Sequence, residues 1–446
     1  MNSPTRLAIA LFVALSVVYL FGLSRTGVLG PDEPRYAAIG RDMARSGDLV
    51  TPRLWGKPWF EKPPVVYWMT AAATRIGLGR ESGPRLPVTL LGFGFVLFFY
   101  FFVRREFGPA EALYATAVLG TSTLWVTYSY VAVTDIPLSV FFCTAWLLTF
   151  EWVKGDEGSL ARALVIGALL GLAVLAKGLV PLILFAPVLW PMRRHITKLL
   201  WIGGACVVVA APWYVLCYVR NGWPFIHDFF IVHHFSRFSS EALQHVRPFW
   251  FFIPVLLGAV FPWTPLFALV RPGLFRDVRL KFAGAWVVFA FLFFSASKNK
   301  LPGYIVPLLP ALALILGLAL GWARRTRIPL FTCALLLGIT PLVASILPQA
   351  LEAGLSKASI RHVDLVWTAW FVLASFVPLL LEFRSRRTEA LAVAALMASL
   401  AFMVGSCESV DVRGKNQAKL GRHCVSAAGH VDCWAHARMA SMSGAR

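Results

Sequence analysis

Residues 86–103 read LPVTLLGFGFVLFFYFFV, a run without a single charged side chain. A helix needs about 20 apolar residues to cross the hydrocarbon core of a bilayer, so this run is long enough for one crossing. Hydrophobic residues make up 58% of the 446-residue chain, and charged residues only 14%. A soluble globule of this size could not bury so much apolar surface. The sequence therefore predicts an all-α, polytopic membrane protein.

Similar apolar runs recur along the chain and predict about thirteen transmembrane helices. This pattern predicts a transmembrane domain over 1–405 and a short polar tail over 406–446. A truncation or frameshift would explain the tail. For the first run a cleaved signal peptide is the alternative, but no A-x-A-like site follows, which favours a retained anchor. The sixth run can also form one broken or re-entrant unit with the fifth. The runs are 7–23, 86–103, 110–128, 136–153, 160–176, 178–192, 199–219, 249–270, 282–297, 303–322, 329–348, 363–381 and 389–405.

Positive charge predicts the orientation, because Lys and Arg are retained on the cytoplasmic side of short loops. Six alternate short loops carry clusters of Lys and Arg, among them Arg104 with Arg105 and Arg193 with Arg194. The amino terminus is then cytoplasmic, and the long loops 24–85 and 220–248 face outward. The same bias accounts for most of the net charge of +20, so we predict no nucleic-acid partner.

Carboxylates gather at the first long loop. An Asp32–Glu33 pair opens this loop in the segment GPDEPRY (30–36), and Glu61 follows in FEKPP (60–64). The chain has only 22 Asp and Glu against 42 Lys and Arg, so acidic residues gathered beside the membrane favour an active site there.

The same loop is predicted to contain two interfacial helices. Residues 34–46 form an amphipathic pattern that places Tyr36, Ile39 and Met43 on one face, with Pro34 near the first turn. A second helix is expected after Pro63 and Pro64. Such helices can roof a site at the membrane surface, and interfacial packing without chemistry is the alternative.

The stretch from PDEPRY (31–36) to RLP (85–87) resembles the first periplasmic loop of a bacterial glycosyltransferase superfamily that uses lipid-carrier donors. This superfamily contains the aminoarabinose transferases and protein O-mannosyltransferases and has the C-type membrane fold. The resemblance extends in order from residue 1 to about 325 and implies a bacterial inner-membrane enzyme with a periplasmic site. Later landmarks agree with it, namely TDIP (134–137), LAKG (175–178), HHFSRF (233–238) and SKNKLPGYIVP (297–307).

Three features depart from the family pattern. Pro34 stands where many relatives have Ala, and His233 stands where the nearest relatives often carry Glu. Members with a large carboxy-terminal soluble domain continue well beyond residue 405, which leaves acceptor recognition open.

A polyprenyl-phosphate sugar requires cations at its site. Breaking the bond between the anomeric carbon and the phosphate leaves a dianionic phosphate on the lipid, and fixed positive charge stabilises that charge most in the transition state. We assign this donor-phosphate contact to cations expected at the outer face. Snorkelling of long side chains at the interface is the alternative for each. The five cations are Lys62, Lys177, Arg237, Lys298 and Lys300.

A hydroxyl acceptor must lose a proton as the new bond forms, so the site also needs a carboxylate. We assign Asp32 as the base and place its neighbour Glu33 in the catalytic group. Asp135, at the mouth of the fourth span, is the second candidate and would orient the acceptor or the donor sugar. Helix capping is the alternative for Asp32 and Asp135.

The remaining candidates orient the substrate or bind a metal. Arg35, Tyr36, Glu61 and Tyr304 are assigned to substrate orientation. Glu61 and His234 resemble a pair that binds a divalent metal in some relatives, although two ligands are a weak metal signature. No other cofactor is predicted.

The prediction is an inverting glycosyltransferase that moves a sugar from undecaprenyl phosphate to lipid A or another periplasm-facing envelope glycan. A protein O-mannosyltransferase-like enzyme is the alternative within this class. A lipid or solute transporter is the alternative from another class, but transporters place ionisable residues near the bilayer midplane, whereas these carboxylates lie at span ends. A non-catalytic scaffold would not need so many charged and aromatic residues on one side.

Overall fold

The computed structural model describes residues 3–21, 23, 32–236 and 247–346, with scattered positions between 372 and 397. Over this part the chain is helical except for one antiparallel hairpin, β1 (Arg53–Leu54) and β2 (Lys57–Pro58). Both residues of its tight turn, Trp55 and Gly56, have a positive φ, as a type I′ turn requires.

Six helical stretches of the described chain are long and apolar enough to cross a membrane. The all-α, multi-pass prediction is therefore confirmed. The stretches are α4 (Ser82–Phe107), α7 (Asp135–Leu148) continued by α8 (Phe150–Lys154), α9 (Leu160–Lys177), α12 (Ile196–Asn221), α16 (Val278–Ala296), and η6 (Pro302–Leu308) continued by α17 (Leu309–Trp322). Two further apolar helices, α1 (Ser3–Leu20) and α18 (Arg327–Ile346), lie at the predicted spans 7–23 and 329–348.

Other predicted spans are interrupted. The run 110–128 forms α5 (Pro109–Thr121) and α6 (Thr123–Ser129), which meet at an extended Ser122. The runs 178–192 and 249–270 both contain prolines. A proline breaks a helix because it has no N–H group to donate the next helical hydrogen bond. The run 178–192 consists of α10 (Val180–Leu184), η1 (Ala186–Val188) and α11 (Leu189–Met192), in agreement with the broken-unit alternative. The run 249–270 consists of η3 (Phe249–Phe251), α15 (Phe252–Ala259) and η4 (Thr264–Leu269).

The start of the second long loop is helical. It forms α13 (Trp223–Ile226) and η2 (His227–Ser236), whose aromatic rings pack on α12, as in the contacts of Phe225 with Trp213 and of Phe229 with Tyr214. A short helix, η5 (Pro272–Arg276), precedes α16. Most of 363–381 and 389–405, and all of the tail 406–446, lie outside the described residues.

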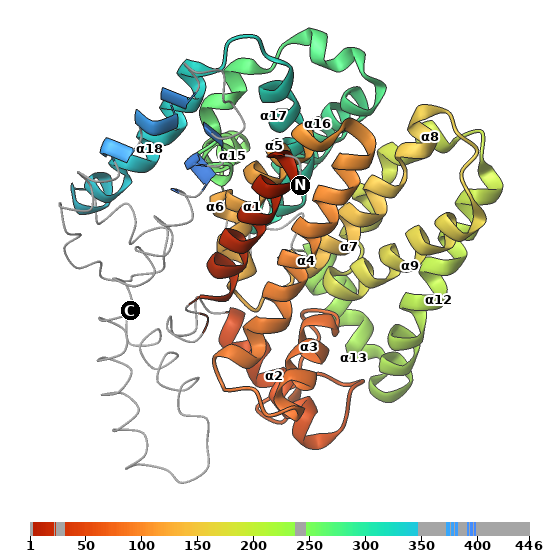
Figure 1. The fold of residues 1–446 in the computed structure, drawn as a ribbon. Helices are drawn as coiled ribbons and strands as arrows, with labels where there is room; N and C mark the ends of the chain where they lie inside the picture. The colour runs from red at the N-terminus through yellow and green to blue at the C-terminus, as the bar shows by residue number, and fades with distance from the viewer. Residues whose placement is uncertain are drawn as a thin grey trace.

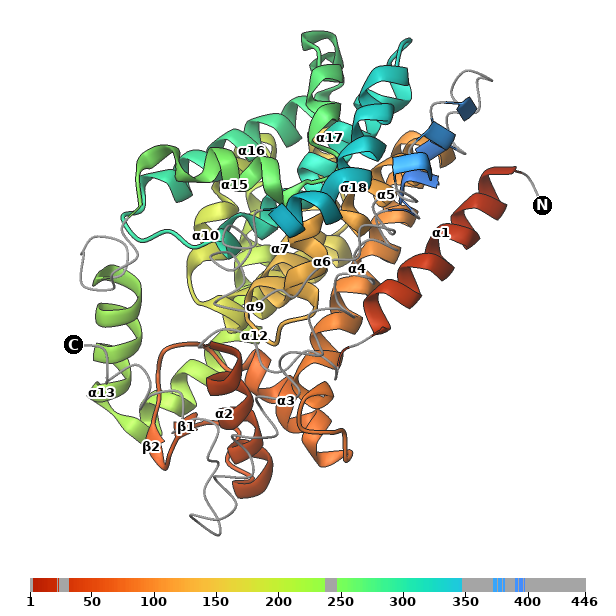
Figure 2. The ribbon, with the colours of Figure 1, turned by 90° about the vertical axis from the view of Figure 1, so that its left-hand side faces the viewer.

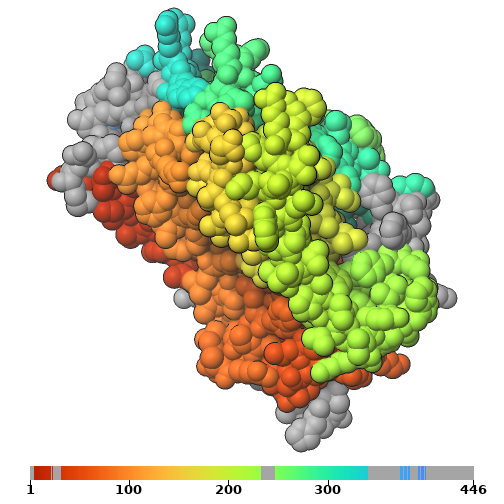
Figure 3. Space-filling view, turned by 90° about the vertical axis from the view of Figure 1, so that its right-hand side faces the viewer, coloured from red at the N-terminus to blue at the C-terminus, as the bar shows by residue number. Residues whose placement is uncertain are grey.

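The long helices pack side by side into a bundle (Figure 1). α12 packs on α9, α9 on α7, and α5 lies between α4 and α17. The centre is α17, with 89% of its apolar window buried, whereas α12 is at the edge, with 22% buried. Figure 3 shows the outer face that α9 and α12 form, with first-loop residues at its lower end.

The first loop forms a compact unit at one end of the bundle (Figures 1 and 2). Its helices are α2 (Asp32–Ser46) and α3 (Val65–Arg75), which pack on each other. The predicted face of Tyr36, Ile39 and Met43 is buried, so the amphipathic prediction is confirmed. These side chains belong to a small hydrophobic core, which we call the loop core, made of Tyr36, Ile39, Met43, Leu54, Val66, Tyr67, Ala71 and Val133.

α2 begins earlier than predicted, at Asp32 rather than at Pro34. Asp32 and Glu33 therefore form its first turn, where the partial positive charge of the helix amino terminus stabilises carboxylates. The two side chains project from adjacent positions of one helical turn, about 100° apart, so they point to different surroundings.

Candidate active site

Glu33 is completely buried and forms a bidentate ion pair with Arg85 at the start of α4. Arg85 donates from Nε to Oε1 over 2.6 Å and from Nη2 to Oε2 over 2.8 Å. Oε1 also accepts a hydrogen bond of 3.1 Å from the Ala132 backbone, and Arg85 donates to the Leu23 carbonyl over 3.0 Å. The pair therefore ties α2 to α4 and to the segment before α7.

Sequence reasoning assigned no role to Arg85, because an arginine at the start of an apolar span is ordinarily explained by snorkelling to the interface. A desolvated, paired carboxylate such as Glu33 holds elements together, because losing either charge leaves the other buried and uncompensated. The catalytic role assigned to Glu33 stays a prediction.

Asp32 faces a different environment, with 36% of its side chain exposed. It forms an ion pair with Arg35 one turn later on α2. Arg35 also lies 3.4 Å from Glu61, and its guanidinium stacks 5.7 Å from the ring centre of Trp59. Lys62 extends the chain of charges, 3.6 Å from the other oxygen of Glu61. The fold thus brings four predicted site residues, Asp32, Arg35, Glu61 and Lys62, into one network.

The network changes the acidity of its neighbours. Burial lowers the pKa of Arg35, but the charges of Glu61 and Asp32 outweigh it and raise that pKa overall. Burial, and then the same two carboxylates, raise the pKa of Tyr36 and of Tyr67 well above the usual value. Both phenols therefore remain protonated near neutral pH and can donate hydrogen bonds.

Two polar atoms beside this network are buried without a hydrogen-bond partner in the part of the chain that the structure describes. They are the hydroxyl oxygen of Tyr67 and Nε1 of Trp59. A buried polar group left unpaired costs about 1–3 kcal/mol, so native proteins keep few of them. These two donors lie beside the charge network and are available to a bound polar group.

Asp135 and Lys177 form a second charged pair at the same end of the bundle. Asp135 is the first residue of α7, Lys177 is the last of α9, and the ammonium lies 2.5 Å from Oδ1. Lys177 also lies 5.2 Å from the ring centre of Tyr304. The cap of α7 is Thr134, with no side-chain cap hydrogen bond. The capping alternative for Asp135 is therefore wrong, because its side chain binds Lys177.

The other predicted cations are placed differently. Lys300 is buried and donates to the carbonyls of Ser297 and, over 3.1 Å, of Arg247. Burial also lowers the pKa of Lys300. Two of its three donors thus hold backbone rather than a ligand. Lys298 is exposed, and Arg237 lies outside the described residues.

Comparison with known proteins finds relatives with a similar sequence and a similar fold. A sequence-family model described as dolichyl-phosphate-mannose-protein mannosyltransferase matches residues 61–216. The undecaprenyl phosphate-alpha-4-amino-4-deoxy-L-arabinose arabinosyl transferase of Serratia proteamaculans is 33% identical over 70% of this chain. That of Pseudomonas aeruginosa is 34% identical over 71% of this chain. The crystal structure of ArnT from Cupriavidus metallidurans bound to undecaprenyl phosphate superposes with a TM-score of 0.80 and 27% identity, over 96% of this chain and 82% of that one.

This chain belongs to the aminoarabinose transferase and protein O-mannosyltransferase superfamily. The alignments span 58% of the Serratia protein and 60% of the Pseudomonas protein, less than two thirds of each. The superfamily resemblance inferred from the loop motifs is confirmed, and so is the fold that it implies.

The superfamily resemblance also implied a metal at Glu61 and His234. Glu61 is buried between Arg35 and Lys62, so its charge is already balanced by two cations. The side chain of His234 is not described, and the described residues contain no group of three or more His, Cys, Asp or Glu that could hold a metal ion. Because the side chain of His234 is not described, the possible metal pair of Glu61 and His234 stays a prediction, and no step below uses a metal.

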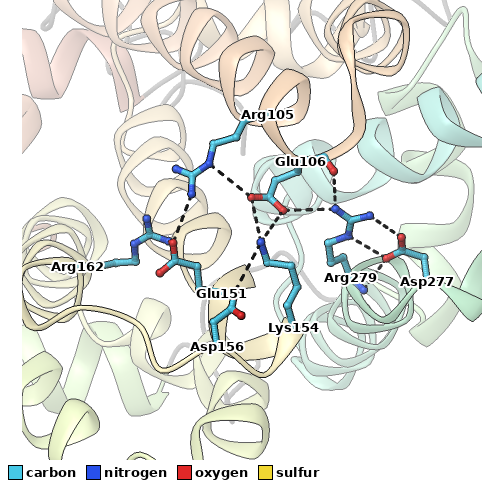
Figure 4. A network of polar contacts seen from close by, with 8 residues as sticks. All are labelled: Arg105, Glu106, Glu151, Lys154, Asp156, Arg162, Asp277 and Arg279. Carbon is cyan, nitrogen blue, oxygen red and sulfur yellow. Dashed lines mark hydrogen bonds and ion pairs between the residues drawn. The ribbon is translucent and has the colours of Figure 1, made fainter.

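A pocket of about 210 Å³ lies far from these residues, at the opposite end of the bundle. Phe98, Phe101 and Phe102 line much of it, and its charged rim belongs to the ion-pair network in Figure 4. None of the predicted site residues lines this pocket, and the charges of its rim pair with one another.

Proposed function

We propose that this protein is an inverting glycosyltransferase that moves a sugar from undecaprenyl phosphate to an acceptor on the outer side of the bacterial inner membrane. The observation that carries the proposal is the match to an undecaprenyl phosphate-bound structure over nearly the whole chain. Within that fold, Asp32, Lys62 and Asp135 gather at one end of the bundle, each beside a partner of opposite charge.

In this proposal the acceptor oxygen attacks the anomeric carbon from the face opposite the phosphate, which inverts the configuration in one displacement. The bond between the anomeric carbon and the phosphate oxygen breaks, and its electron pair stays on the lipid phosphate. Lys62 stabilises that developing charge. Asp32 takes the proton when the acceptor is a hydroxyl, and Asp135, held by Lys177, orients the sugar.

The orientation is part of the proposal. Arg104, Arg105 and Lys154 lie at the end of the bundle opposite α2 and α3, as a cytoplasmic face requires. The amino terminus is then cytoplasmic, and the site faces the periplasm.

Lipid A or another envelope glycan is the proposed acceptor, in keeping with the names of the aligned arabinosyl transferases. A protein acceptor is the second candidate. The match of residues 61–216 to the protein mannosyltransferase family model favours it.

Mass spectrometry of lipid A, envelope glycans and envelope proteins from cells with and without this protein tests the function. We expect one component to gain the mass of a pentose or hexose derivative only when the wild-type protein is present. Cells producing Asp32→Asn serve as the inactive control. Modified protein without modified glycan would select the second candidate, and unchanged masses in all three fractions would contradict both.

A further inference from the structure

Tyr128, near the end of α6, lies between the two halves of the candidate site. No motif in the sequence singles it out. Its half-buried ring packs both on the loop core and on the main core of the helix bundle. α6 also contacts α7 and η6, the elements that carry Asp135 and Tyr304. The ring is therefore wedged between the first-loop helices and the transmembrane helices.

Gly303, in η6, leaves room for the hydroxyl group of Tyr128 and the carboxylate of Asp135 to approach each other. A Cβ atom built on Gly303 would lie 2.6 Å from Oδ1 of Asp135 and 2.7 Å from the hydroxyl oxygen of Tyr128. Such contacts are too short for any side chain, so this position requires glycine. The carboxylate and the phenol thus face each other across a glycine.

The Tyr128 ring also packs against the loop core, to which Tyr36, Ile39 and Met43 of α2 belong. Tyr128 therefore contacts the first-loop unit that carries Asp32, and its hydroxyl group lies close to Asp135 of α7.

We infer that Tyr128 is a positioning residue that sets the separation of Asp32 and Asp135. The inference rests on the proposed function, in which both carboxylates serve one bound sugar. A smaller side chain would let α2 shift toward η6, and the two carboxylates would no longer bracket the sugar in its reacting geometry. Misplacement by about 1 Å can lower a rate about 100-fold, and it acts on turnover more than on binding of the donor lipid.

The kinetic test compares Tyr128→Leu with Tyr128→Phe in purified protein in lipid. Tyr128→Leu removes the wedge, so we expect kcat to fall about 100-fold while KM for the polyprenyl donor changes less than about threefold. Tyr128→Phe keeps the ring and should retain most of kcat. Tyr130→Leu is the matched control, because Tyr130 lies two residues away and its hydroxyl binds the Val18 and Phe21 carbonyls instead of the site. It should lower stability but leave kcat per folded molecule near wild type.

Gly303→Ala tests the other side of the contact. The new methyl group should push Asp135 and Tyr128 apart and lower kcat alone. In the Tyr128→Leu background the methyl group meets a smaller neighbour, so its added effect should be clearly less than its effect in wild type. Strictly multiplicative losses would show that the two residues act independently, against the inference.

A distance measurement tests the inference without turnover. Spin labels at Ser46 on α2 and Pro302 on η6, both exposed, report the separation of the two elements that Tyr128 holds apart. We expect one narrow distance distribution in wild type and Tyr128→Phe, and a shifted or broadened one in Tyr128→Leu. An unchanged distribution with wild-type kcat overturns the inference alone. Absence of turnover in wild type overturns the proposed function, and the distance measurement then decides the inference by itself.

Discussion

The two ends of the helix bundle both carry networks of charged side chains, but the networks are built differently. At the end opposite the first loop, four cations and four carboxylates tie α4, α8, α9 and α16 together (Figure 4). Arg279, for example, binds both Asp277 on its own helix start and Glu106 at the end of α4. Every side chain labelled there has at least one partner of opposite charge.

At the first-loop end the network is shorter, and polar atoms without partners lie beside it. Asp32, Arg35, Glu61 and Lys62 all come from the segment 32–62, while the hydroxyl oxygen of Tyr67 and Nε1 of Trp59 stay unpaired in the described part of the chain. A charge network alone does not identify a site. Buried donors without a partner occur at both ends, because Nε1 of Trp146, whose ring packs on Phe150 and Phe282, is also unpaired among the described residues. The two ends differ in that the segments GPDEPRY (30–36) and FEKPP (60–64) lie only at the first-loop end.

The largest expected effect concerns which end of the helix bundle faces the periplasm. In a background without the seven native cysteines, Ser46→Cys should react with a membrane-impermeant reagent in intact cells. Asp156→Cys, exposed at the opposite end, should react only after the inner membrane is permeabilised. The reverse pattern would invert the orientation and place the proposed site in the cytoplasm.

The largest kinetic effect is expected at Asp32. When the acceptor is a hydroxyl, Asp32→Asn should lower the single-turnover rate about 100- to 10,000-fold, because a general base is lost. Asp42→Asn on the same helix is the matched control and should remain near wild type. Equal rates for both variants would remove Asp32 from the mechanism and leave Asp135 as the carboxylate to examine.

The buried pair should dominate stability. Glu33→Gln leaves Arg85 as a buried charge with only neutral partners in place of the carboxylate, which costs about 3–5 kcal/mol. Thermal unfolding in detergent should show a large drop in midpoint. A midpoint close to wild type would mean that Glu33 does not hold α2 against α4.

Lys62→Ala should act mainly on the donor. Removing a cation from the proposed phosphate contact is expected to cost about 2–4 kcal/mol of transition-state stabilisation, with a raised KM for the polyprenyl donor. Lys57→Ala, on the exposed strand β2 of the same loop, is the control. Wild-type kinetics for Lys62→Ala would leave interfacial snorkelling as the better explanation of this lysine.

The smallest effect is expected at the opposite end. The side chain of Arg105 is 64% exposed, so its ion pairs with Glu106 and Glu151 are screened by solvent. Arg105→Gln should change the free energy of unfolding by no more than about 1 kcal/mol and leave sugar transfer unchanged. A large loss of transfer in this folded variant would show that the two ends are not functionally separate.

Local pattern allowed much of the fold to be predicted, including the possible break at 178–192, but not the breaks within 110–128 and 249–270. The amphipathic face of α2 follows from the spacing of Tyr36, Ile39 and Met43, and it is buried as expected. The start of α2 at Asp32 was not predicted, because Pro34 also fits as its first residue. The site segment was found by its composition. The pairing of its side chains depends on contacts that no local window contains.

The sequence by itself determined that this is a multi-pass helical membrane protein and which loop carries the candidate chemistry, because hydropathy, charge bias and short motifs are local properties. Only the tertiary structure decided what each charged residue does. Asp32 and Glu33 are neighbours in the chain, yet Glu33 meets Arg85, 52 residues away, in the protein interior, while Asp32 stays at the surface of the site. Likewise, Asp135 finds Lys177 only because α7 packs against α9. Burial and long-range pairing depend on how the helices pack, so adjacent carboxylates of the same charge acquire different roles.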